Sequence, residues 1–165
     1  MGLDMYLYAV KELYSGNVIK EINKNIDAPF KNYKTVEVKI GVMYWRKANA
    51  IHNWFITNCA DGIDECQNVY VSIEQLKQLR DLCKDVLDHS KLVYDKSDIK
   101  NEYIIEDPSY AMKNLPTASG FLFGSIEYNQ DYYEDVKNTL ECLDNILSIN
   151  IKEFEDWYFI YKASW

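Results

Sequence analysis

The sequence has few residues that interrupt regular structure and no long apolar run. Three prolines and six glycines are spread over 165 residues, and no stretch is rich in Pro, Gly and Ser. We therefore expect no linker and a single domain over residues 1–165. No apolar run approaches the roughly 20 residues that cross a membrane, and no signal peptide pattern is present. These absences predict a cytoplasmic protein with no membrane partner.

Basic residues are also scarce. Lys and Arg number 18 against 26 Asp and Glu, which gives a formal net charge of −8, and no basic run is present. Binding to DNA or RNA through the phosphate backbone needs a basic face, so neither is expected as a partner. A small anion remains compatible with this charge, because a local pocket can oppose the field of the whole protein.

Signatures of catalysis and of metal binding are missing. The four cysteines form no CxxC and no zinc-type cluster with the two histidines, and the acidic loop at 61–65 lacks EF-hand spacing. No metal and no cofactor is therefore expected. All four cysteines are interpreted as reduced, although Cys59 and Cys66 bracket the acidic loop and could form a disulfide. The cysteines are Cys59, Cys66, Cys83 and Cys142.

Hydrophobic periodicity divides the chain into strands and helices in mixed order. Strands are expected at 3–10, 35–45, 69–71, 117–129 and 156–165. Helices are expected at 17–25, 46–59, 72–90, 108–115 and 132–147, and 91–107 is predicted to be irregular. Hairpin-like neighbours rather than repeated βαβ units predict an α+β fold, with a mainly antiparallel sheet and helices packed on one face.

Local patterns support several of these elements. Val36, Val38, Ile40 and Val42 alternate with polar residues and predict one buried face, with Gly41 as a possible bulge. Ser72 and Gln75 have capping-box spacing at the start of a helix. That helix carries an apolar stripe made of Leu76, Leu79, Cys83 and Val86.

The first candidate site is residues 43–55, where a strand is expected to give way to a helix at Arg46. Arg46, Asn49 and Asn53 would then form one polar stripe, because residues three and four apart share a helix face. Arginine and amides suit a phosphate, and aromatic rings suit a base. His52, Trp45 and Trp54 flank the stripe. The alternative is that both tryptophans belong to the core and that Arg46 pairs with a surface acid.

The second candidate site is residues 115–128, LPTASGFLFGSIEY. Glycines at 120 and 124 would let the backbone approach a ligand closely. The segment matches neither a P-loop nor a GxSxG elbow. The alternative is an ordinary strand with Phe121 and Phe123 in the core. The candidate polar contacts are Thr117, Ser119, Ser125, Glu127 and Tyr128.

Several blocks stand out along the chain: MGLDMYLY at the start, YWRKANAIHNWF, LPTASGFLFGSIEY and DYYEDVKNTLE within it, and the closing ASW. Together these blocks resemble a family of small phage and prophage proteins. The resemblance implies a viral accessory protein that acts in the cytoplasm of a bacterial host. It carries over no catalytic residues.

Three functions follow as hypotheses. The first is a non-enzymatic protein that sequesters a nucleotide-derived immune signal, either ADP-ribose-type (Thoeris) or cyclic (CBASS), by analogy with other small phage proteins. The second is an interaction module that binds a host protein through tyrosine-rich surfaces. The third is a nucleotide-cleaving enzyme in which His52 or Glu127, or the two as a pair, act as acid and base. A ligand buried at a subunit interface would make the protein a homo-oligomer.

Overall fold

The computed structural model describes residues 2–14, 16–26, 34–95, 102–150 and 154–165. Its strands are β1 (Asp4–Leu13), β2 (Val36–Arg46), β3 (Val69–Val71), β4 (Leu92–Tyr94), β5 (Tyr103–Ile105) and β6 (Tyr158–Ser164). Its helices are α1 (Gly16–Ile26), α2 (Asn49–Cys59), α3 (Ile73–Asp88), α4 (Ser109–Asn114) and α5 (Gln130–Ser148). Within these residues, no helix is both long enough and apolar enough to cross a membrane.

The main sheet is antiparallel throughout, with the strand order β2-β1-β6-β3. Its register gathers most of the buried apolar side chains on one face, which we call the inner face, whereas Val10 of β1 and Ile160 of β6 are buried on the other face. Leu7 of β1 is paired with Met43 of β2 on one side and with Tyr161 of β6 on the other. The inner-face residues form one buried cluster with side chains from α2, α3 and α5. The predicted α+β class is confirmed.

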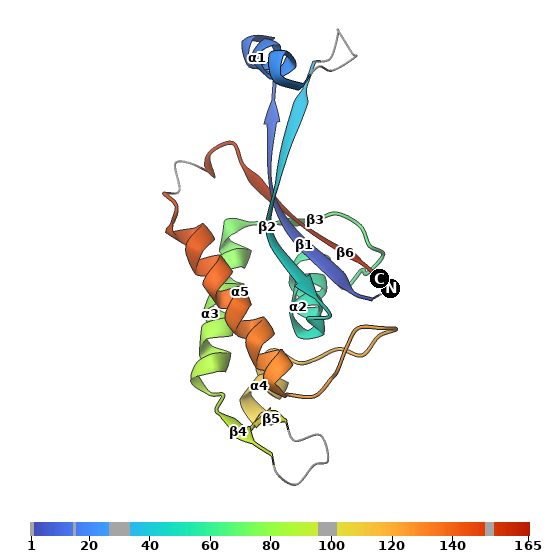
Figure 1. The fold of residues 1–165 in the computed structure, drawn as a ribbon, viewed down its shortest axis with the longest axis vertical. Coiled ribbons are helices and arrows are strands. Elements are labelled where there is room, and N and C mark those ends of the chain that lie inside the picture. Colours follow the sequence, from blue (N-terminus) through green and yellow to red (C-terminus); the bar gives the residue numbers. More distant parts are fainter. Residues whose placement is uncertain (1, 15, 27–33, 96–101, 151–153) are drawn as a thin grey trace.

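The helices pack as their apolar stripes indicate. Figure 1 shows α3 and α5 side by side against the sheet, and the two helices make extensive contact. The predicted stripe of α3 is buried, and the capping box forms: Gln75 N–H donates to Ser72 Oγ at 3.1 Å and Ser72 N–H donates to Gln75 Oε1 at 2.9 Å. In α5, the apolar residues Val136 and Leu143 are buried in the same way.

A bulge in β2 corrects the predicted alternation. Leu7 pairs with Met43, whereas Tyr8 pairs with Gly41, so Val42 is the extra residue. The inner face of β2 therefore runs through Val36, Val38 and Ile40 and then shifts by one residue to Met43 and Trp45. Gly41 indicated a bulge in the sequence. The alternation of apolar and polar residues, however, could not show that the inward-facing positions change from even-numbered to odd-numbered residues after it.

Three predicted segments differ from the structure. Arg46 is the last residue of β2, and α2 begins only at Asn49. Residues 117–129 form an irregular loop rather than a strand, with only an isolated bridge between Ile104 and Asn129. Residues 92–94 and 103–105, which were predicted to be irregular, pair as the β4–β5 hairpin.

The end of the β1–β2 hairpin extends beyond the rest of the sheet. β6 pairs with β1 only from Asp4 to Val10, whereas β2 follows β1 as far as Leu13. Lys11–Leu13 and Val36–Val38 therefore form a two-stranded ribbon, and α1 lies at its end (Figure 1). β2 has no strand on its other side within the described residues.

Candidate functional site

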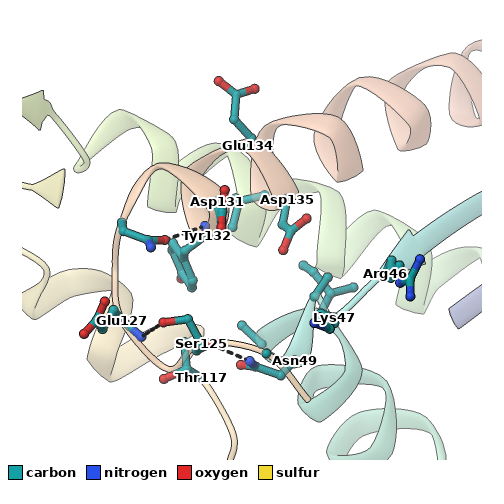
Figure 2. A pocket seen from close by; sticks show the side chains of 16 residues that line it. Arg46, Lys47, Asn49, Thr117, Ser125, Glu127, Asp131, Tyr132, Glu134 and Asp135 are labelled. Carbon is teal, nitrogen blue, oxygen red and sulfur yellow. Dashed lines mark hydrogen bonds between the residues drawn. The ribbon is translucent and has the colours of Figure 1, made fainter. Parts of the chain in front are cut away.

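A pocket of about 370 Å³ lies between the end of β2, the start of α2, the loop 117–129 and the first turns of α5. We call it the α2–α5 pocket (Figure 2). Its volume is within the range of small-molecule sites. Its polar lining residues are Arg46, Lys47, Asn49, Thr117, Ser125, Glu127, Asn129, Asp131, Tyr132, Glu134 and Asp135.

The corner between β2 and α2 shapes one wall. Lys47 has a left-handed backbone with φ of 63°, and its N–H donates to the carbonyl of Leu3 at 2.8 Å. Gly124 of the loop lies against this corner with φ of 96°. A Cβ atom on Gly124 would stand 2.9 Å from Lys47 Cβ and 3.1 Å from the Lys47 carbonyl oxygen. The loop can approach Lys47 this closely only because residue 124 is glycine.

Asn49, in the first turn of α2, fastens the loop. Its Nδ2 donates to the carbonyls of Phe123 at 3.2 Å and Ser125 at 2.7 Å, and its Oδ1 accepts from the N–H of Ala118 at 3.1 Å. The side chain is only 3% exposed. Both donors of the amide are thus committed to the loop, so Asn49 builds the pocket wall and has no N–H left for a ligand.

The opposite wall is the acidic start of α5. Asn129 caps this helix by accepting from the N–H of Tyr132 at 3.3 Å, and the Tyr132 hydroxyl donates to the Leu115 carbonyl at 2.8 Å. Figure 2 shows Asp135 and Tyr132 pointing into the cavity. Burial, with a smaller contribution from the charge of Asp131, raises the pKa of the Asp135 carboxyl to about 7. Burial thus favours the neutral form of this carboxyl over the charged one.

The cations lie on the β2–α2 side. Arg46 Nε is 3.9 Å from Asp4 Oδ1, and the arginine side chain is 62% exposed. This weak contact matches the alternative in which Arg46 pairs with a surface acid. No acid among the described residues lies within ion-pair distance of Lys47. The pocket thus has two cations on the β2–α2 side, the carboxylates of α5 on the opposite wall, and Glu127 on the loop 117–129.

Five of the ten predicted site residues line this pocket. They are Arg46, Asn49, Thr117, Ser125 and Glu127, so the two candidate segments do come together. The stripe that was predicted to connect Arg46 with Asn49 and Asn53 does not form, because Arg46 is in a strand. The other five are outside the lining: Trp45, His52, Asn53, Ser119 and Tyr128.

The two tryptophans belong to the core. Trp45 is 3% exposed and Trp54 is 7% exposed, and Trp45 Nε1 donates to Thr139 Oγ1 of α5 at 2.8 Å. Tyr128 instead supports the loop, since its hydroxyl accepts from the N–H of Thr117 at 3.2 Å. The alternative interpretation of the tryptophans, as core residues, is therefore confirmed.

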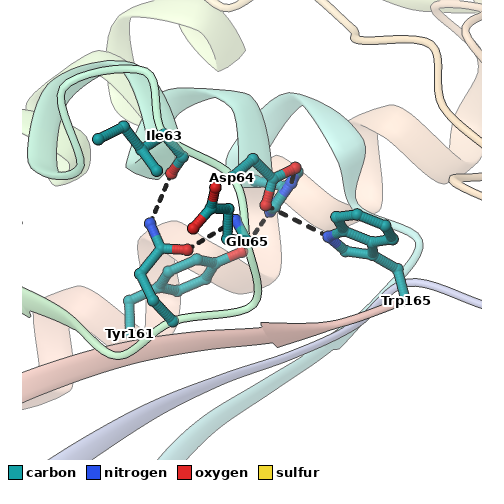
Figure 3. Close-up of polar contacts among 7 residues, drawn as sticks. Ile63, Asp64, Glu65, Tyr161 and Trp165 are labelled. Carbon is teal, nitrogen blue, oxygen red and sulfur yellow. Dashed lines mark hydrogen bonds and ion pairs between the residues drawn. The ribbon is translucent and has the colours of Figure 1, made fainter.

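His52 is not part of the pocket lining and belongs to a polar network with Asp64 and Tyr161, two residues that Figure 3 labels. Its Nδ1 is 2.7 Å from the Tyr161 hydroxyl and its Nε2 is 3.0 Å from Asp64 Oδ2, while Asp64 Oδ1 accepts from Trp165 Nε1 at 3.2 Å. Burial, and then the charge of Asp64, raises the pKa of the Tyr161 hydroxyl well above its ordinary value. The protonated hydroxyl donates to Nδ1, which leaves Nε2–H to donate to Asp64. Both ring nitrogens are engaged, so His52 is not free to exchange protons with Glu127.

Lys47 and the α5 residues were missed from the sequence. The available signal was the run Asn129 to Asp135, which combines a helix cap with three acids directly after the second candidate segment. Glu134 and Asp135 were interpreted only as part of a regular helix, and Asp131 was placed before its start. Within the described part of the chain, no group of three or more His, Cys, Asp or Glu is placed to hold a metal ion, and the four cysteines are free thiols.

No protein-family model, curated protein or solved structure matches this chain.

Proposed function

We propose that the protein binds a small nucleotide-type ligand in the α2–α5 pocket and releases it unchanged. The observation that carries this proposal is the separation of charge across the cavity. Arg46 and Lys47 lie on one side, and Asp131 and Asp135 lie on the other. Such a cavity suits a ligand that has an anionic group at one end and hydroxyl or amino donors at the other.

The phosphate of such a ligand belongs beside Lys47, which has no acid of the described residues within ion-pair distance. Ribose hydroxyls or a base amino group belong beside α5, because carboxylates accept hydrogen bonds from these donors. The raised pKa of Asp135 reduces the repulsion between α5 and an anionic ligand, because the protonated carboxyl carries no charge. Because both tryptophans lie in the core, recognition rests on charge and hydrogen bonds rather than on indole stacking.

The resemblance to phage proteins supports a biological setting for such binding. A phage protein that holds a nucleotide-derived immune signal in the host cytoplasm would prevent that signal from activating a defence effector. The ligand classes to test are therefore ADP-ribose-type signals of Thoeris and cyclic nucleotides of CBASS.

The deciding experiment is a thermal-shift survey with both signal classes and common mononucleotides, followed by calorimetry on any ligand that stabilises the protein. A specific ligand at about 100 times its Kd adds about 2.7 kcal/mol to the stability. Lys47→Ala should weaken binding about 10- to 100-fold through loss of a charged hydrogen bond. Lys113→Ala, an exposed lysine on α4, is the matched control and should leave the affinity unchanged.

Three outcomes would contradict the proposal. If no nucleotide changes the melting temperature, the pocket is not a nucleotide site. If mass spectrometry of the denatured complex recovers a cleaved ligand instead of an intact one, the protein is an enzyme. An unaltered affinity in Lys47→Ala would move the site away from this pocket.

The loop 117–129 favours a second candidate function, binding of a host protein. Phe121 is 82% exposed, and Leu122 and Ile126 are also exposed on the same loop. Exposed aromatic side chains of this kind are enriched at interface hot spots. A stoichiometric host protein that is captured by the wild type and lost in Phe121→Ser, with no small molecule retained, would favour this function over the first.

A further inference from the structure

The free edge of β2 has a self-complementary sequence. On its outer face Glu37 and Lys39 flank Val38, and on its inner face Val36 and Ile40 flank the same residue. A second copy of the strand, laid antiparallel with Val38 opposite Val38, would pair every Glu37 with a Lys39. It would also pair every Val36 with an Ile40. Cross-strand pairs of opposite charge and of β-branched residues stabilise sheets.

Other registers lose this match. Centring the pair on Glu37 places two glutamates opposite each other, and centring it on Lys39 places two lysines opposite each other. A register shifted by one residue puts Glu37 opposite Val38, so that a charged position faces an apolar one across the ladder. Only the pairing centred on Val38 matches charge with opposite charge and apolar with apolar.

Two unfavourable features of the structure would be relieved by this pairing. Glu37 lies directly opposite Glu12 in the β1–β2 ladder, which is an unfavourable like-charge pair. Among the described residues, no cation forms an ion pair with either glutamate. Ile40 is 48% exposed although it lies on the inner face of the sheet. A Lys39 and a Val36 from a second copy would lie beside these two residues.

Among the described residues, no strand occupies the outer side of this edge. Val36–Val38 lie in the two-stranded ribbon, which extends beyond β6 in Figure 1. The bulge at Val42 ends the regular edge, and beyond it the Val42 carbonyl accepts from the Cys142 thiol of α5 at 3.3 Å. The free segment therefore coincides with the self-complementary one.

We infer that two copies of this chain associate through the β2 edges, antiparallel and centred on Val38, to form a continuous eight-stranded sheet from two four-stranded ones. The pairing is isologous, so each contact occurs twice. It involves few residues, which predicts a dimer that dissociates on dilution, as small interfaces do. None of the residues that form it lines the α2–α5 pocket.

Sedimentation velocity over a concentration series tests the association, with charge variants as the probe. The wild type should change from monomer to dimer as the concentration rises. Glu37→Lys should abolish the dimer, because the introduced lysine would then face Lys39 of the other copy. The double variant E37K/K39E should restore it, because the charges are exchanged. A wild type that stays monomeric, a dimer that is insensitive to Glu37→Lys, or a double variant that stays monomeric would each overturn the inference.

Misfolding is separated from loss of association by the melting temperature. Glu37→Lys replaces the Glu12–Glu37 repulsion with an attraction, so the variant should melt no lower than the wild type.

Cross-linking then checks the register in a background that lacks the partly exposed Cys59, Cys66 and Cys142. Val38→Cys should form an intermolecular disulfide, whereas Ile40→Cys should form one only when it is mixed with Val36→Cys. Efficient linking of Ile40→Cys to itself would overturn the Val38-centred register.

Discussion

The side-chain amide of Asn49 lies 2.7 Å from the carbonyl oxygen of Ser125, which joins the first turn of α2 to a loop 76 residues further along the chain. The same amide also bonds Phe123 and Ala118. One buried side chain therefore substitutes for the strand pairing that the loop 117–129 lacks, and it fixes the shape of the α2–α5 pocket.

Replacing Asn49 should be costly. Asn49→Ala leaves two carbonyls and one N–H of the loop without their partner, and we expect a loss of about 2–4 kcal/mol in the free energy of unfolding. Urea denaturation measures this loss. Asn53→Ala, one turn along the same helix at a half-buried position, is the control and should change stability by less than about 1 kcal/mol. Equal effects of the two substitutions would contradict the role of Asn49.

Gly124→Ala should destabilise the protein by about 1–3 kcal/mol, because alanine at φ of 96° is strained and its Cβ would meet Lys47. Gly16→Ala is the matched control, since a Cβ there meets nothing within 4 Å. Its effect should be neutral or slightly stabilising at the start of α1. Thermal unfolding of the two variants side by side gives the comparison, and a stable Gly124→Ala would argue against the close approach.

The Asp135 carboxyl should make stability depend on pH. Its pKa is raised on folding from 3.8 to about 7, so folding favours the protonated form. The stabilising contribution of that form is fully present below about pH 4 and is lost as the pH rises through 7. Asp135→Asn removes the cost of burying the charge and should stabilise the protein by about 1–3 kcal/mol at pH 8, with little effect at pH 4.

Denaturation of Asp135→Asn and wild type at several pH values checks this dependence. Glu141→Gln, at an exposed position of the same helix, is the control. A difference between Asp135→Asn and wild type that stays constant from pH 4 to pH 8 would show that the carboxyl is not desolvated in the folded protein.

Tyr161→Phe should cost about 1–3 kcal/mol, because it removes the hydroxyl that donates to His52 Nδ1 in a buried site. The aromatic ring of Phe would keep the stacking on Phe55, whose ring centre lies 4.1 Å away. Tyr70→Phe is the control, since Tyr70 is 69% exposed. Chemical denaturation gives both values, and a Tyr161→Phe variant as stable as Tyr70→Phe would contradict a buried network centred on His52.

The sequence predicted the elements whose periodicity is strong. Local patterns in the sequence are enough to indicate such elements, and the structure confirms several of them. They are the apolar stripe of α3, its capping box at Ser72, and strands β1, β3 and β6. The loop 117–129 was mistaken for a strand because its Phe121 and Phe123 alternate with smaller residues. In the structure Leu122 and Gly124 have positive φ, which ends any extended run, and alternation carries no information on that angle.

Only part of the candidate site could be predicted, because local sequence patterns do not show which distant segments meet. Small and polar residues in two segments indicated a shared site, and five of them meet in one pocket. The third wall comes from α5, whose acids look like an ordinary helix start until the fold brings them opposite Lys47. Likewise, His52 was interpreted as one of a polar group around a stripe, because its partners Asp64 and Tyr161 become neighbours only through tertiary structure.

The position of β6 in the sheet has a consequence for how the chain acquires its structure. β6 lies between β1 and β3, so β3 is connected to β1 only through residues 158–164. During synthesis, β1 and β2 can form a hairpin early. β3 can join the sheet only after β6 has left the ribosome. Contacts between such distant segments slow folding. We therefore expect the apolar faces of the core helices to stay partly exposed until β6 is in place, and exposed apolar surface of this kind favours aggregation and chaperone binding.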